Sequence, residues 1–235
     1  PGNYTVNIVP TSKDGKLLVS LSSEVLNGEI TYTIDGSEPT LQSTKYTGPI
    51  EMNSSAILKA SAIVNWRILG VQAVKQNFVI HKAIGCKVTY TNPVSKYYLA
   101  DGPNSLTDGI KGTDAVGKFW HGFNGVDLIA TIDLGEIKNI QNMALGCLQH
   151  YNDWIFLPQW VKFETSNDGI TFTEIKTVIN PVDINQKTAI FEFKTTFPTH
   201  AVRFIRVTAK NNLCPAGHSG AGKPGWIFGD ELTVD

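Results

Sequence analysis

Residues 158–172 read PQWVKFETSNDGITF, and this stretch decides the fold class. Side chains of a β-strand point to opposite faces in turn, so Val161, Phe163 and Thr165 share one face. The Asp-Gly pair at 168–169 supplies the positive φ that a tight hairpin turn needs. The stretch therefore predicts a strand with these three side chains on one face, a tight turn and a return strand.

Short alternating runs of this kind recur along the chain. Residues 17–21, 30–34 and 58–62 place apolar side chains at every second position, and Asn-Gly at 27–28 and Asp-Gly at 35–36 mark turns between them. No segment has the sustained helical periodicity and the caps of a long helix. These patterns predict an all-β protein built from sandwiches.

Composition limits the classes of function. The chain has 235 residues, enough for one large all-β domain or two ordinary ones. Its net charge is −1 and its Lys and Arg do not cluster, which argues against nucleic-acid binding. No apolar run reaches the roughly 18 residues of a membrane span, so we expect no membrane insertion. Cys86, Cys147 and Cys214 lack the CxxC spacing of zinc sites, and the sequence leaves open whether two of them pair.

A distinctive run lies in the first third of the chain. Residues 30–40 read ITYTIDGSEPT, and KYTGPI and ILKA follow at 45–50 and 57–60. This run resembles the small fibronectin-III-like domain that follows the catalytic barrel of bacterial chitobiases and β-hexosaminidases. We therefore assign residues 1–83 to an Ig/fibronectin-III-like sandwich. The resemblance implies a spacer domain, and we expect it to carry no site of its own.

Four motifs in the remaining residues occur in a recognisable order. They are WHGF at 120–123, IDLG at 132–135 ending a first strand, VRFIRV at 202–207 and the closing strand at 226–234. Together with the 158–172 stretch they resemble the discoidin domain (coagulation factor V/VIII type C). We assign residues 84–235 to this galactose-binding-domain-like jelly-roll sandwich. Bacterial members are largely carbohydrate-binding modules, so the resemblance implies sugar binding.

The discoidin resemblance also implies a structural Ca²⁺. Family members often have an Asp-Gly pair and a Thr five residues after the Asp, which wrap Ca²⁺ together with backbone carbonyls and a Glu of the closing strand. The matching positions are Asp108, Thr113 and Glu231, with carbonyls at Ser105 and Ile110. Such a loop suits Ca²⁺, which takes about six to eight oxygen ligands. The alternative is an ordinary Asx-turn at Asp108 and an exposed Glu231 at a strand edge.

Three loops carry the residue types of a sugar site. Aromatic faces stack on the C–H patches of sugars, and polar groups satisfy their hydroxyls. The loops span 120–124, 149–156 and 211–226. We predict carbohydrate binding by His150, Tyr151, Asn152, Trp154, His218, Lys223 and Trp226. Trp154 and Phe156 have the alternative of being core aromatics, and His218 that of a mobile loop residue. Trp120 is expected in the core.

Catalysis by this chain is not expected. Asp230-Glu231 resembles the Asp-Glu pair of retaining β-hexosaminidases of glycoside hydrolase family 20, in which Glu is the general acid. That pair sits on a barrel of about 250 residues, longer than this chain, whereas here it lies in an expected β-strand. We therefore predict no catalytic residue here.

These observations lead to one interpretation and its alternatives. We interpret the chain as the spacer and glycan-targeting fragment of an exported bacterial β-N-acetylhexosaminidase. Its expected partners are glycans with terminal galactose, N-acetylgalactosamine or N-acetylglucosamine and an upstream catalytic domain. We expect a monomer located in the periplasm, at the cell surface or outside the cell. The alternatives are a structural or adhesion tail without a sugar site and a lipid-binding discoidin, which the scarcity of loop cations disfavours.

Overall fold

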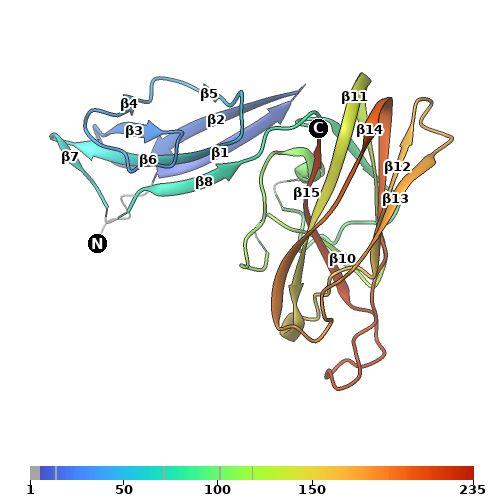
Figure 1. The fold of residues 1–235 in the computed structure, drawn as a ribbon. Helices are drawn as coiled ribbons and strands as arrows, with labels where there is room; N and C mark the ends of the chain where they lie inside the picture. The colour runs from blue at the N-terminus through green and yellow to red at the C-terminus, as the bar shows by residue number, and fades with distance from the viewer. Residues whose placement is uncertain (1–5, 14, 71, 101, 118) are drawn as a thin grey trace. The chain divides into compact units, whose positions relative to one another are not determined.

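The computed structural model describes residues 6–13, 15–70, 72–100, 102–117 and 119–235. It divides into two compact units, residues 1–80 and 81–235. Both units consist of β-strands, and the described residues contain only two helical segments, each a short 3₁₀ turn (Figure 1). The all-β class predicted from the sequence is confirmed. Among the described residues, no helix is long and apolar enough to cross a membrane.

Unit 1 is a sandwich of two antiparallel sheets. Its strands are β1 (Val6–Lys13), β2 (Lys16–Ser23), β3 (Glu29–Thr33), β4 (Thr44–Lys45), β5 (Ile50–Glu51), β6 (Ala56–Val64), β7 (Arg67–Ile68) and β8 (Val74–Phe78). One sheet has the order β1-β2-β5, and the other has the order β4-β3-β6-β7 with β8 also paired to β6. Leu17, Val19 and Leu21 of β2 are buried, as are Leu58 and Ala60 of β6. The period-two patterns therefore mark the faces that form the core of this unit.

Unit 2 contains the longer strands. Its elements are β9 (Lys87–Tyr90), η1 (Ser105–Thr107), β10 (His121–Asn124), β11 (Leu128–His150), η2 (Tyr151–Asp153), β12 (Trp160–Ser166), β13 (Thr173–Ile179), β14 (Thr188–Ala209) and β15 (Trp226–Val234). The strand order is β10-β15-β11-β14-β12-β13, and β9 also pairs with β11.

The two longest strands, β11 and β14, run through both layers of this jelly roll. The first half of β11 pairs with β9 and the second half pairs with β15, while β14 pairs with β11 along both halves. The expected strand end at 132–135 is wrong, because the strand bends there and continues. The register shifts between Asp133 and Lys138, and Gly135 has a φ of 82°. A bulge with a left-handed glycine bends a strand without ending it.

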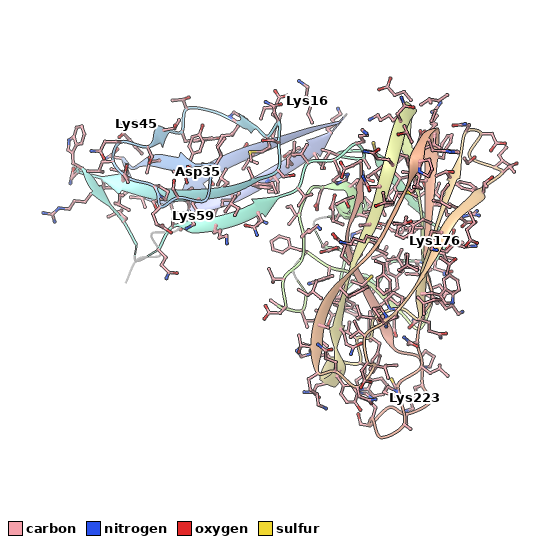
Figure 2. The ribbon with its side chains drawn as sticks, in the orientation of Figure 1. Lys16, Asp35, Lys45, Lys59, Lys176 and Lys223 are labelled. Atoms are coloured by element: carbon pink, nitrogen blue, oxygen red, sulfur yellow. The ribbon has the colours of Figure 1, made fainter. Side chains whose placement is uncertain are left out.

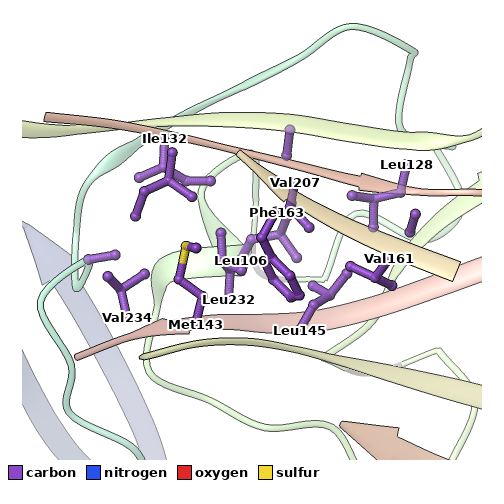
Figure 3. Packing of buried hydrophobic residues seen from close by; sticks show 14 of the residues in the cluster. Leu106, Leu128, Ile132, Met143, Leu145, Val161, Phe163, Val207, Leu232 and Val234 are labelled. Carbon is purple, nitrogen blue, oxygen red and sulfur yellow. The ribbon is translucent and has the colours of Figure 1, made fainter. Parts of the chain in front are cut away.

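The core of unit 2 lies between these layers (Figure 3). Side chains from both halves of β11, such as Ile132 and Leu145, meet Phe163 of β12, and all three are fully buried. Val161 and Thr165 are buried beside Phe163, as the alternation in 158–166 predicts. The three cysteines are all free thiols, and all are buried.

Candidate functional site

One end of unit 2 is built by two loops that are far apart in the sequence. The first is η2 with the residues that follow it, and the second spans 210–225 and contains Lys223, labelled in Figure 2. The Trp226 N–H donates to the Trp154 carbonyl at 2.8 Å, and the Phe156 N–H donates to the Trp226 carbonyl at 3.0 Å. These backbone bonds hold the two loops together. The seven predicted sugar-binding residues all belong to these loops or to the ends of the strands beside them.

Trp154 is held in an unusual backbone conformation. Its φ is 65° and its ψ is 19°, in the left-handed region, and its side chain is half-buried. The indole packs on Gly220, where an added Cβ would lie 2.4 Å from the ring. A bulky residue held in this region costs on the order of 1–3 kcal/mol, so the surrounding structure must enforce it. Such strain at a loop that carries aromatic and polar groups points to a functional position.

The side chain of His218 joins the two loops at this end of unit 2. It is buried, and its Nδ1 accepts the Gly220 N–H at 3.0 Å. Its Nε2 therefore carries the proton and donates to the Tyr151 carbonyl at 2.9 Å. The ring also makes edge contacts with Tyr151, Trp154 and Phe156. Both nitrogens are occupied, so His218 positions the two loops and leaves no ring nitrogen for a sugar hydroxyl. It is a buried residue rather than a mobile one.

Two lysines lie over the aromatic rings of this end. Lys187 Nζ is 4.0 Å from the ring centroid of Tyr151, and Lys223 Nζ is 5.9 Å from that of Trp154. Both lysines are exposed. Lys187 was missed in the sequence, because it lies outside the three candidate loops and only the fold brings it to Tyr151. Ammonium groups at this distance from an aromatic face are held by cation–π attraction.

The other candidates differ in how accessible they are. Asn152 is exposed, and His150 Nδ1 lies 3.0 Å from the exposed Asp153 carboxylate. Trp226 is half-buried and makes edge contacts with Tyr98 at 5.3 Å and Phe228 at 5.9 Å. Trp226 thus belongs largely to the aromatic packing beneath the loops. Half-buried rings surrounded by exposed amide, carboxylate and ammonium groups can stack on a sugar and bond its hydroxyls.

Two further aromatic residues of the candidate loops lie in the core. Phe156 is fully buried, so it is a core residue. Trp120 is also fully buried, as expected, and its indole N–H donates to the Thr113 carbonyl at 3.0 Å. Neither ring can serve as a sugar platform.

A second candidate site surrounds Glu231 of β15. Its side chain is fully buried rather than exposed at a strand edge. Its Oε1 accepts the Gly109 N–H at 3.0 Å and lies 2.6 Å from His81 Nε2. His81 Nδ1 accepts the Ala83 N–H, so Nε2 carries the proton and donates to Glu231. Burial lowers the pKa of His81 to about 4, which keeps this histidine neutral.

The same carboxylate retains an unsatisfied oxygen. Glu231 Oε2 is buried and has no hydrogen-bond partner among the described residues. Burial raises the pKa of Glu231 well above its ordinary value, the Asp230 charge raises it further, and hydrogen bonds from Gly109 and an interaction with Asp108 act in the opposite direction. Burial also raises the pKa of Asp230 to about 6. A hard cation would satisfy the orphan oxygen and neutralise these acids.

The remaining predicted calcium ligands fit less well. Asp108 Oδ1 accepts the Ile110 N–H at 2.8 Å, which is the Asx-turn considered above, although Asp108 also lies beside Glu231. Thr113 is exposed, its hydroxyl accepts the Ala115 N–H and its carbonyl accepts the indole N–H of the buried tryptophan. Ser105 is buried in η1. In the described part of the chain, no group of three or more His, Cys, Asp or Glu is arranged to hold a metal. Backbone carbonyls would have to complete the coordination of a cation.

Comparisons with known families divide the chain as its two units do. Residues 11–67 match the model of the chitobiase/β-hexosaminidase C-terminal domain, and residues 87–222 match that of the F5/8 type C domain. No curated protein matches the chain.

The solved structures that are similar to this chain include three modules. Chitosan-binding module 1 of the chitosanase/glucanase from Paenibacillus sp. IK-5 shares 15% identity over 66% of this chain and 98% of its own, with a TM-score of 0.43. CBM32-3 of a family 31 glycoside hydrolase from Clostridium perfringens shares 17% identity over 63% of this chain and 90% of its own, with a TM-score of 0.43. CpGH89CBM32-5 from Clostridium perfringens, solved in complex with GalNAc-β-1,3-galactose, shares 15% identity over 63% of this chain and 94% of its own, with a TM-score of 0.41.

Proposed function

Because this chain belongs to the F5/8 type C domain family, we propose that unit 2 binds the terminal sugars of glycans without catalysing their hydrolysis. The observation that carries the proposal is Trp154, which is held in a left-handed conformation with its half-buried indole beside exposed polar groups. Asp230 and Glu231 do not suggest catalysis, because both carboxylates are buried in β15.

The proposed ligand stacks on Trp154 and Tyr151, and its hydroxyls bond Asn152 and Lys223. Galactose, N-acetylgalactosamine and N-acetylglucosamine have the apolar faces and hydroxyls that such a site requires. Shallow loop sites bind single sugars weakly, with a Kd of about 0.1–1 mM, which is about −4 to −5.5 kcal/mol. Lys187 adds a second ammonium group over the aromatic rings, so uronic acids belong in the same panel of test ligands.

Such weak binding is useful when the site is tethered to an enzyme. A binding module raises the local concentration of its glycan around a linked active site, and no chemistry of its own is needed. We propose that the chain serves an exported bacterial glycoside hydrolase, a β-N-acetylhexosaminidase, in this way and acts as a monomer. The match of residues 11–67 to the chitobiase/β-hexosaminidase C-terminal domain supports the choice of parent enzyme.

Calorimetry on the full chain tests the binding site. Titration with the sugars above should give binding that Trp154→Ala abolishes. Ile170→Ala is the control, because it also truncates an apolar side chain of unit 2, one that is 84% exposed in the β12–β13 turn. If Trp154→Ala binds the sugar as the parent chain does, the site lies elsewhere. If no sugar or uronic acid binds the folded chain, the rival proposal of a structural tail takes its place.

We also propose that a hard cation, Ca²⁺ by the chemistry of its oxygen donors, is held at Glu231 and Asp108. When bound, the cation would neutralise these carboxylates and fix the loop after η1 to β15. A ligand that binds only the folded state stabilises it by about 2.7 kcal/mol at 100 times its Kd. Melting in CaCl₂ should therefore occur at a higher temperature than melting in EDTA, and Glu231→Gln should remove the difference. Equal melting temperatures for the parent chain in CaCl₂ and EDTA would contradict a bound cation.

A further inference from the structure

Unit 1, which was expected to carry no site, contains a pocket of about 340 Å³. It lies on the face of the β4-β3-β6-β7 sheet that carries Glu29 of β3 and its partner Ile63 of β6, opposite to the face of Ala60 and Ala62. Ile63 is buried at the base of this face, whereas Glu29 is exposed. Lys45, labelled in Figure 2, adds a side chain from β4. The pocket is lined by Asn27, Glu29, Leu41, Lys45, Ile63, Asn65 and Trp66.

Trp66 is exposed at the rim of this pocket in a way that neither packing nor backbone preference explains. Its side chain is 80% exposed. Asn65 and Trp66 form the two-residue turn between the paired Val64 and Arg67, and their φ angles are 47° and 61°. Two positive φ angles define a type I′ turn, whose second position favours glycine. The chain thus places a tryptophan where glycine would relieve strain and where the ring gains little burial.

Exposed polar groups lie around the exposed indole. Lys45 Nζ lies 5.9 Å from the Trp66 ring centroid and bonds both carboxylate oxygens of Glu29, at 2.8 and 3.0 Å. Asn27 and Asn65 add two amide side chains to the lining. The two charges neutralise each other, so the pocket offers donors and acceptors without a net charge. This favours a neutral ligand with many hydroxyls over an anion or a cation.

We propose that this pocket is a second carbohydrate site, in which a neutral pyranose stacks on Trp66 and its hydroxyls bond Glu29, Lys45 and the two asparagines. A hexopyranose has the required apolar face and ring of hydroxyls. The volume lies at the lower end of the range of ligand pockets, about 300–1,000 Å³, which suits one sugar residue rather than an extended chain. The site goes beyond the proposed function of unit 2 and stands on observations of unit 1 alone.

Two sugar sites on one chain change how it would bind a polymeric glycan. When one site is occupied, the second meets its ligand at the effective concentration set by their connection, and the overall affinity exceeds that of either site. The domain described as a spacer would then contribute to targeting. Loss of either site should weaken retention on an insoluble glycan by a larger factor than the weak affinity of the lost site alone would suggest.

NMR on the full chain tests the second site apart from the first. The five tryptophan indole N–H signals are titrated with galactose, N-acetylgalactosamine, N-acetylglucosamine and tri-N-acetylchitotriose, and the Trp66 signal is identified by its loss in Trp66→Gly. We expect a saturable shift of the Trp66 signal at a Kd of about 1 mM for at least one sugar. The shift should persist in Trp154→Ala and weaken severalfold in Glu29→Gln, which keeps the indole.

The outcomes separate the two proposals. A Trp66 signal that stays unmoved by all four sugars at about ten times the expected Kd overturns the second site, whatever Trp154 does. A Trp66 shift that is equally strong in Glu29→Gln and Lys45→Met overturns the assignment of the polar contacts to this pocket. A shift of the Trp66 signal with an unmoved Trp154 signal supports the second site and counts against the proposed function of unit 2.

Discussion

The turn at Asn65-Trp66 gives a direct test of strain, through replacement of Trp66 by glycine and, separately, by alanine. Both variants remove the indole and its 5.9 Å contact with Lys45, so these losses cancel when the two are compared. The two variants then differ in the cost of the left-handed backbone conformation and in the freedom of the unfolded chain. The 80% exposure of Trp66 means that neither variant opens a cavity.

The expected difference follows from the φ of 61° at this position. A left-handed conformation costs an L-residue roughly 1–2 kcal/mol and costs glycine almost nothing. Glycine also gives the unfolded chain more conformational freedom than alanine does. This lowers the stability of the glycine variant by about 0.4–1 kcal/mol and offsets part of its advantage. Trp66→Gly should therefore be more stable than Trp66→Ala by about 1 kcal/mol, equivalent to roughly 4–8 °C in Tm for a unit of this size.

The assay is thermal unfolding of the full chain, followed by the amide NMR signals of β6 so that the readout belongs to unit 1. Arg67 in the adjacent strand is the matched control position. There the order should reverse, because glycine weakens a strand relative to alanine. If Trp66→Ala melts at or above the temperature of Trp66→Gly, the turn at residue 66 is not strained. The argument that Trp66 is kept there for a function would then fail as well.

Three further predictions concern unit 2. Arg206→Ala should lower the free energy of unfolding by about 1–3 kcal/mol, because it removes a two-bond ion pair from the buried Glu164, and an unchanged urea midpoint would contradict this. Backbone hydrogen bonds lower the pKa of Asp168 from 3.8 to about 2, so its stabilisation is present above pH 4 and lost between pH 4 and 2. The Tm of the parent chain should fall more steeply over that interval than the Tm of Asp168→Asn. Gly220→Ala should displace the Trp154 indole, which an added Cβ would approach to 2.4 Å, and weaken sugar binding at least tenfold in calorimetry while the chain stays folded.

Local features of the fold were predictable because they depend on neighbouring residues. The alternation around Phe163 and the positive φ of Gly169 are both present in the structure. The expected tight turn is wrong in length, because β12 ends at Ser166 and β13 begins at Thr173, so residues 167–172 form a longer connection. The continuation of β11 past Gly135 was not predictable, since a glycine that ends a strand and one that bends it look alike in sequence.

The sites depend on contacts between distant residues and were predicted less well. His218 meets the Tyr151 carbonyl 67 positions away, and His81 meets Glu231 150 positions away. No local pattern signals either contact. Trp66 was missed although its turn is local, because the turn at residues 65–66 lacks the glycine that usually marks such a turn.

The central claim is that unit 2 binds terminal sugars through Trp154. The most direct measurement applies the full chain and its Trp154→Ala variant to a glycan array, with and without EDTA. We predict binding to one class of terminal sugar, strong reduction in the variant and weakening by EDTA. Absence of binding across the array, by a chain whose cooperative melt shows that it is folded, would contradict the claim.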